Sequence, residues 1–321
     1  MLVASRSHLA SRRQFVRQIA LAAAPAVSTT MAAKDSSASI GFALGTYGMQ
    51  SMKTPDALRT LAGFGYDGVE LALMPGWPTE AKLLSSGDRA ELRRMLGDLG
   101  LALPAMLESL PLVGSPDKRA ANLERLKQAA QLANDLAPSK PPVLDTILGS
   151  QTSAWETVKG RMVDELKDWM KVCEPARFVV CFKPHAGHAV HTPERALWLI
   201  QQVGSPNLRV VYDYSHFYVE GLPLAATLRE LLPVSPFISV KDAAGSPDKH
   251  EFLLPGDGKT DYVAYFKLLK ELGYHGFVSV EVSAMIFRKG GYEPVPTAKL
   301  CYERLAPAFV KAGIRRPIHK G

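Results

Sequence analysis

The sequence predicts an α/β protein built as a single (β/α)8 TIM barrel, and three observations support this prediction. Short apolar runs alternate with amphipathic runs of helical period from residue 40 to residue 312. Eight runs of each kind occur, which is the number that the barrel requires. Similar punctuation also precedes similar elements, as in GYDG at 65–68 and GYHG at 273–276. A doubly wound open sheet is the alternative architecture.

The first half of the chain supplies four strands and four helices. The helix after the first strand begins at the TPD sequence of 54–56 and ends at Gly63, and apolar residues at 92, 95, 96 and 99 predict the next helix. The expected strands of this half are the apolar runs at 40–44, 66–71, 101–107 and 142–148, and the expected helices lie at 54–63, 92–99, 118–136 and 155–172.

The second half repeats the pattern. Thr192 is expected to cap a helix that begins at Pro193 and ends before Gly204. A polar loop is expected over 243–260. The expected strands are 178–182, 208–212, 236–240 and 277–282, and the expected helices are 193–203, 223–231, 261–272 and 297–312.

The N-terminal segment has the pattern of an export signal. The basic stretch 11–17 precedes a short Ala-rich run at 19–27 and small-residue cleavage sites, so residues 1–33 are predicted to be removed and 34–321 to form the barrel. The run is shorter than the ~20 apolar residues that span a membrane. The paired Arg12 and Arg13 make it resemble a twin-arginine signal, which implies export of the folded protein to the periplasm.

Composition excludes several classes of protein. Four arginines and no acid lie in residues 1–33, so the net charge of +7 falls to +3 without them, and no nucleic-acid partner is predicted. The three cysteines form no CxxC pair, which argues against a disulfide framework or a zinc site. No strand runs into a GxGxxG or P-loop sequence, so no dinucleotide or Walker-type nucleotide site is predicted.

Ionisable side chains gather where the expected strands end. The active site of a barrel of this kind lies at the carboxyl ends of its strands, so these residues are the candidates for chemistry. They are Glu70, Glu108, Asp145, Lys183, His185, Asp213, His216, Lys241, Asp242 and Glu281.

At these residues the sequence resembles the sugar phosphate isomerase/epimerase family of xylose isomerase-like barrels. The resemblance rests on GYDGVEL (65–71), VYDYSH (211–216), ISVKD (238–242) and the stretch 253–282. It implies one divalent ion held by a Glu after strand five, an Asp after strand six, a His in strand seven and a Glu after strand eight. Asp213 and Glu281 match two of these positions. Lys183 and Ser239 stand where the other Glu and the His are expected.

The two replaced ligand positions leave the role of a metal open. One divalent ion (Mn, Mg, Co or Zn) is expected on Asp213 and Glu281 if His185 or His216 supplies nitrogen in place of a missing ligand. Alternatively, Lys183 provides the positive charge and polarises a substrate oxygen itself. A single base, or a lysine base with a depressed pKa, then fits better than two carboxylate bases on opposite faces of the substrate.

We therefore expect an isomerase or epimerase-like enzyme that acts on a carbohydrate or polyol by proton transfer next to a carbonyl. Glu281 is the expected base and Lys183, His185 and Lys241 complete the catalytic set. The expected substrate-binding residues are His216, Glu70, Glu108 and Asp242, although a salt bridge between Lys241 and Asp242 is an alternative. Two other functions stay open, a barrel that binds a sugar or partner without catalysis and a lyase that forms a Schiff base on Lys183. Assembly into a homo-oligomer is also left open.

Overall fold

Eight parallel strands close into a barrel in the computed structural model, which describes residues 39–317. The first strand pairs with the second and with the last, so the sheet has no open edge. The expected (β/α)8 barrel is therefore confirmed, and the open-sheet alternative is wrong. The barrel strands are β1 (Gly41–Gly45), β2 (Gly68–Ala72), β3 (Ala102–Leu107), β4 (Val143–Thr146), β5 (Val180–Phe182), β6 (Leu208–Asp213), β7 (Phe237–Val240) and β10 (Phe277–Val280).

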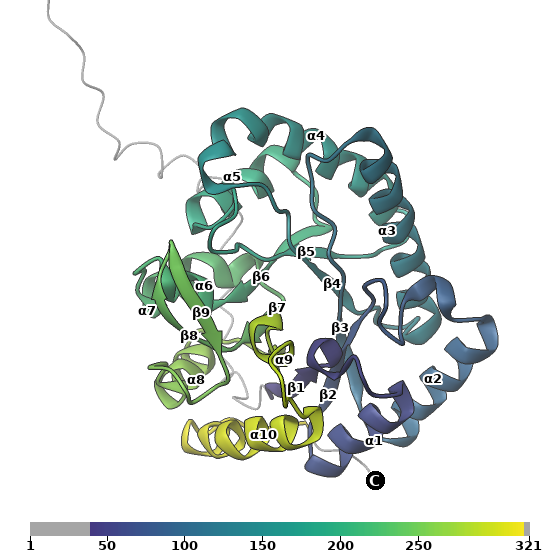
Figure 1. Cartoon of the computed structure of the whole chain (residues 1–321), viewed down its shortest axis with the longest axis vertical. Helices are drawn as coiled ribbons and strands as arrows, with labels where there is room; N and C mark the ends of the chain where they lie inside the picture. Colours follow the sequence, from purple (N-terminus) through teal and green to yellow (C-terminus); the bar gives the residue numbers. More distant parts are fainter. Residues whose placement is uncertain (1–38, 318–321) are drawn as a thin grey trace, which may run out of the picture. The chain divides into compact units, whose positions relative to one another are not determined.

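Helices surround the barrel, as Figure 1 shows with the strands in the centre. The expected caps of α5 are present, since Thr192 accepts a hydrogen bond from the Arg195 N–H and Gly204 is left-handed at φ 72°. The first helix ends at Gly65 (φ 93°) and not at the expected Gly63. The surrounding helices are α1 (Thr54–Phe64), α2 (Ser86–Asp98), α3 (Pro116–Leu136), α4 (Trp155–Cys173), α5 (Pro193–Val203), α7 (Leu224–Leu231), α8 (Tyr262–Glu271) and α10 (Pro294–Lys311).

Further short elements follow the carboxyl ends of strands. Helix α6 (Tyr214–Val219) follows β6, and α9 (Ala284–Phe287) follows β10. The predicted polar loop 243–260 instead contains most of an antiparallel hairpin of β8 (Asp242–Ser246) and β9 (Lys249–Leu253), which extends beside the barrel in Figure 1. Single 3-10 turns are Thr46–Met49, Ala81–Leu83, Thr152–Ala154 and Leu232–Val234.

The barrel interior is divided into layers because alternate side chains of each strand point inward. In β6 the inward side chains are Arg209, Val211 and Asp213 from the amino to the carboxyl end. The middle of the barrel is filled by a group that we call the apolar layer. It consists of Ala105, Cys181, Val211 and Phe237, with Val143, Val179 and Phe277 packed against them.

Glycine makes room for the Phe277 ring of this layer. A Cβ atom at Gly41 would lie 2.3 Å from the Phe277 ring, and one at Gly68 would lie 2.9 Å from it.

The apolar layer separates the polar carboxyl end of the barrel from its amino end. The main hydrophobic core lies outside it, between strands and helices.

The predicted export signal falls on residues 1–33, outside the residues that the structure describes. Within 39–317, no helix combines the length and the apolar character needed to cross a bilayer. The three cysteines are free thiols and are buried.

Candidate active site at the carboxyl ends of the strands

Six ionisable side chains from six strands meet above the apolar layer, and we call them the strand-end cluster. Lys183, Lys241 and Glu281 directly follow β5, β7 and β10, and Asp213 is the last residue of β6. Glu70 and Asp145 lie within β2 and β4, near their carboxyl ends. All six are buried or nearly so. The cluster consists of Glu70, Asp145, Lys183, Asp213, Lys241 and Glu281.

Lys183 lies at the centre of three carboxylates. Its Nζ is 3.1 Å from Asp145 Oδ2 and 3.6 Å from Asp213 Oδ2, and it forms an ion pair with Glu281 Oε2. It also donates to the Ser239 hydroxyl at 3.3 Å. The side chain is 3% exposed, so these contacts take the place of water around the ammonium group.

Lys241 contacts two of these three acids, Asp213 and Glu281. Its Nζ is 2.5 Å from Asp213 Oδ2 and 3.1 Å from Glu281 Oε1. Asp213 and Glu281 therefore face a common centre with two lysyl cations between them. The alternative salt bridge between Lys241 and Asp242 does not form.

The charges of the cluster fix which groups are ionised. Burial lowers the pKa of Lys183, but Asp145, Glu281 and Asp213 outweigh it and raise that pKa well above its usual value. The hypothesis of a lysine base with a depressed pKa is therefore wrong for Lys183. Burial raises the pKa of Glu281, yet Lys183 and Lys241 together hold it well below the ordinary range.

Glu70 and Asp145 are the two acids of the cluster whose pKa values are raised. Burial, and then the charge of Asp145, raise the pKa of Glu70 to about 8, and burial raises the pKa of Asp145 to about 6 despite Lys183. Glu70 Oε1 and Asp145 Oδ1 have no hydrogen-bond partner. Gly45 provides the space for Glu70, because a Cβ there would lie 2.9 Å from Glu70 Oε2.

Three histidines stack beside the lysines. The His185 ring lies 4.2 Å from the ring of His188 and 4.0 Å from that of His216. His185 Nδ1 lies 2.8 Å from the Ala186 carbonyl oxygen, which assigns the proton to Nδ1 and leaves Nε2 as an acceptor. Burial, and then the neighbouring His188, lower the pKa of His185 to about 3, so the ring is neutral.

His216 lies between the histidine stack and the cluster. Its Nδ1 accepts from the Ala186 N–H at 3.3 Å, and its Nε2 is 3.3 Å from Lys241 Nζ and 3.6 Å from Asp213 Oδ2. Burial lowers the pKa of His216 well below its usual value, and the positive neighbours act in the same direction. The ring is therefore a neutral spacer with one edge at the cluster.

Glu108 and Asp242, two of the residues expected to bind substrate, have other partners. Glu108 forms an ion pair with Arg125 of α3 and accepts from the Ser109 N–H at 2.8 Å. Asp242 Oδ2 accepts from the N–H groups of Gly256 and Gly258 at 2.7 and 3.0 Å. Both carboxylates hold loops in place in this structure, whereas Glu70 and His216 lie at the cluster.

Aromatic side chains flank the cluster on two sides. Phe252 of β9 lies with its ring 4.8 Å from Lys241 Nζ and 4.7 Å from the His216 ring. On the other side Tyr47 stacks on Trp77 at 5.4 Å and meets Phe287 of α9. Glu281, at 14%, has the most exposed side chain among the ion-paired members, so the cluster opens to solvent beside it.

Sequence reasoning did not assign roles to Phe252, Ser279 or Asp145. Ser279 donates to Glu70 Oε2 at 3.2 Å. The inward alternation Phe277, Ser279, Glu281 was the signal that could have identified it. No local signal marks Phe252, because its contacts arise when the hairpin folds over the barrel.

The residues present do not fit the divalent ion that the resemblance implies. Ammonium groups of Lys183 and Lys241 stand between Asp213 and Glu281, where a metal ion would meet two positive charges. His185 directs its Nδ1 proton to a backbone carbonyl. Within residues 39–317, no three His, Cys, Asp or Glu side chains are grouped so that they could bind a metal ion.

A closed barrel of parallel strands surrounded by helices defines a TIM-barrel protein. In TIM-barrel enzymes the active site lies at the carboxyl ends of the strands, where the strand-end cluster lies here. The chain belongs to the xylose isomerase-like TIM barrel family, which it matches over residues 58–299.

Relatives with curated names include isomerases, epimerases and a dehydratase. A mouse protein named putative hydroxypyruvate isomerase is 29% identical over 253 residues, covering 71% of this chain and 83% of its own. The inosose isomerase of Bacillus velezensis is 26% identical over 259 residues, covering 76% and 89%.

A solved barrel from Mycobacterium smegmatis, in complex with magnesium, superposes with a TM-score of 0.64. It is 16% identical and the match covers 85% of this chain and 97% of that one. This likeness supports the fold.

Proposed function

We propose that the protein is an isomerase of small hydroxycarbonyl compounds, of the carbohydrate or polyol class, that moves a proton next to a carbonyl with two lysines as the electrophile. The observation that carries the proposal is the pair of buried ammonium groups between Asp213 and Glu281. Relatives named as isomerases of hydroxypyruvate and inosose support the reaction class.

The lysine pair supplies what an enolate needs. Proton removal next to a carbonyl places negative charge on the carbonyl oxygen, and fixed cations in a buried site stabilise that charge more than water does. Lys183 stays protonated because of its carboxylate neighbours, so it can donate a hydrogen bond throughout the reaction. Asp213 positions Lys241 through their 2.5 Å contact.

Glu281 is the base in this proposal. Lys183 and Lys241 hold its pKa low in this structure. A substrate oxygen that binds the two ammonium groups takes contacts from Glu281, so the carboxylate regains basicity as the reaction begins. It removes the proton from the hydroxyl-bearing carbon, gives an enediolate, and returns the proton to the neighbouring carbon. A hydroxyl proton passes directly from one substrate oxygen to the other while Lys183 stays protonated and donates a hydrogen bond to them.

Single-base transfer favours isomerisation over epimerisation. Epimerisation from opposite faces needs a second carboxylate where Lys183 stands. Histidine is not a replacement in the ground state, because Nε2 of His185 accepts protons only weakly when burial lowers the pKa of the ring to about 3.

The test is exchange of carbon-bound hydrogen in D2O, followed by NMR, with hydroxypyruvate and small ketoses as substrates. We expect exchange that survives EDTA, and loss of exchange in Glu281→Gln and Lys183→Met. Glu293→Gln, an exposed acid, is the matched control. Exchange that requires added metal, or that persists in Glu281→Gln, would refute the proposal. Substrate binding without exchange in the unchanged chain would instead establish the non-catalytic alternative.

A lyase that forms a Schiff base on Lys183 is disfavoured by the same charges. Imine formation needs a neutral amine, and three carboxylates keep Lys183 protonated. Borohydride treatment with substrate, followed by mass spectrometry, should leave Lys183 unmodified.

We also propose that the chain is exported in the folded state through the twin-arginine pathway. The support is the Arg12-Arg13 pair before a short apolar run. Replacement of both arginines with lysine should abolish periplasmic recovery of the protein in cell fractionation. Periplasmic recovery that is unchanged by this replacement would contradict the proposal.

A further inference from the structure

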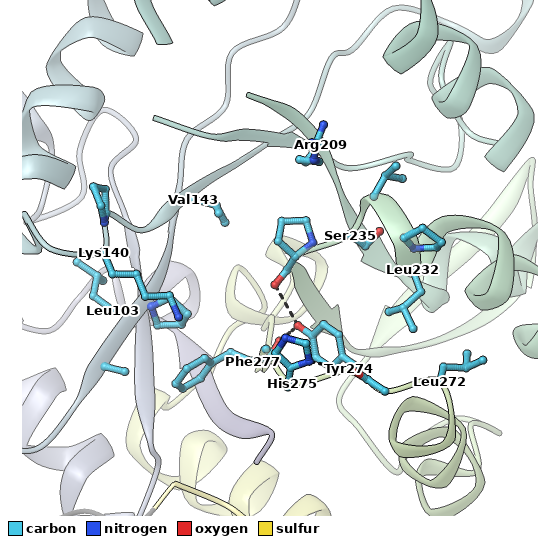
Figure 2. A pocket seen from close by; sticks show the side chains of 18 of the residues that line it. Leu103, Lys140, Val143, Arg209, Leu232, Ser235, Leu272, Tyr274, His275 and Phe277 are labelled. Carbon is cyan, nitrogen blue, oxygen red and sulfur yellow. Dashed lines mark hydrogen bonds between the residues drawn. The ribbon is translucent and has the colours of Figure 1, made fainter. Parts of the chain in front are cut away.

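A cavity lies at the opposite end of the barrel from the strand-end cluster. It has a volume of about 730 Å³ and is bordered by the amino ends of β3, β4, β6, β7 and β10. This volume is in the ordinary range of small-molecule sites. Figure 2 shows Arg209, Val143 and Phe277 around the same open space, with Lys140 at one side.

The inner wall of this cavity is apolar. Val143 and Phe277 line it and belong to the underside of the apolar layer, and Leu103 of β3 adds a further aliphatic surface. The cavity is therefore separated from Asp213 and Glu281 by packed side chains. A ligand there would contact hydrocarbon on its inner side.

The polar side of the cavity is cationic. Lys140, Arg209 and Arg229 line it, and its lining includes no Asp or Glu. Within the described residues 39–317, no carboxylate oxygen lies within 4.0 Å of the charged nitrogens of these three side chains.

Arg209 is the cation that points into the barrel. It shares the inward face of β6 with Val211 and Asp213 and is half-buried. Its Nη1 donates to the carbonyl oxygens of Leu208 at 2.9 Å and Ser205 at 3.4 Å, and its other two guanidinium nitrogens have no hydrogen-bond partner among residues 39–317. A guanidinium group in this position has donors available for a planar anion.

We propose that this cavity binds an amphiphilic carboxylate, with the carboxylate on Arg209 and the hydrocarbon against Val143 and Phe277. A hydrocarbon alone would leave the guanidinium without an anionic partner, and a small inorganic anion would leave the apolar wall without a contact. Both features together select a monoanion with an apolar tail. The inference does not depend on the reaction at the carboxyl end.

Calorimetric titration of the full chain with octanoate tests the proposal. Octan-1-ol keeps the tail without the charge, and acetate keeps the charge without the tail. We expect octanoate to bind at least about 10-fold more tightly than either, the effect of a charge-assisted hydrogen bond in a partly buried site. Equal binding of octanoate and octanol would overturn the proposal, as would no binding of octanoate.

Variants locate the site. Arg209→Gln should weaken octanoate binding about 10-fold or more, and Arg209→Lys, which keeps the charge, should retain part of it. Arg94→Gln, which removes an exposed arginine, is the matched control. Circular dichroism verifies folding of each variant, and the comparison of the three ligands on the unchanged chain holds if Arg209→Gln does not fold. Binding that is unaffected in a folded Arg209→Gln would refute the assignment.

Discussion

Replacement of Lys183 with methionine would remove a buried cation from among three acids. The ammonium group is 3.1 Å from Asp145, 3.6 Å from Asp213 and in contact with Glu281, at 3% exposure. Methionine has a similar length and fills the space, so the change acts mainly through charge. Four carboxylates of the strand-end cluster would then share the single ammonium group of Lys241.

The expected cost at about pH 7.5 is about 3–5 kcal/mol in the free energy of unfolding, the usual result of removing one partner of a buried ion pair. Urea unfolding followed by fluorescence measures it. Lys171→Met is the matched control, because that lysine pairs with Asp168 at 76% exposure. Its replacement should change stability by less than about 0.5 kcal/mol.

The pH dependence separates charge from packing. Without Lys183, the buried acids have pKa values in the folded state above those in the unfolded chain, so the folded variant binds more protons. Its stability therefore rises as pH falls, and the deficit relative to the unchanged chain should shrink between about pH 7.5 and 5. A Lys183→Met protein within about 1 kcal/mol of the unchanged chain at pH 7.5 would refute the reasoning. A deficit that grows toward pH 5 would do the same.

Three other changes have defined outcomes. Glu70→Gln should raise the melting temperature at pH 8 and lose this gain toward pH 4.5. Burial raises the pKa of Glu70 from 4.5 to about 8, so the cost of ionising it in the folded chain grows as pH rises from 4.5 to 8. An equal effect at both pH values would contradict this expectation. The double variant Lys183→Glu, Ser239→His should bind Mn²⁺ in calorimetric titration, since it supplies the two metal ligands that the family resemblance implies. Absence of a binding heat would count against this expectation. Asp242→Ala should lose about 1–3 kcal/mol of stability and increase proteolysis near Gly258, whose N–H it leaves without an acceptor; an unchanged digestion pattern would show that the loop is held otherwise.

The barrel and the convergence at its carboxyl end could be predicted from sequence, because parallel strands and period-2 alternation bring distant residues to one edge. Asp213 and Glu281, which are far apart in the chain, were expected around a common cation, and the structure places two lysines there. Capping by Thr192 could be predicted because it is local, with the Thr192 side chain accepting from the Arg195 N–H.

Partners set by tertiary packing could not be predicted. Glu108 pairs with Arg125 from the following helix, and Asp242 meets the N–H of Gly256 only after the hairpin has folded. Asp145 was among the strand-end candidates, but its role depends on its contact with Lys183 from the next strand, which the sequence does not specify. The β8–β9 hairpin was predicted as a loop because its residues are mostly polar, and its buried apolar contacts come from Ala243 and Phe252.

The apolar layer gives the two ends of the barrel thermodynamic independence. Ala105, Cys181, Val211 and Phe237 contain no acid and no strong hydrogen-bond donor through which a proton or a charge could be relayed. Changes made above and below them should therefore contribute additively to stability in double-mutant cycles. A library of substitutions around Arg209 can then be combined with one around Glu281, and each effect measured singly will hold in the combination.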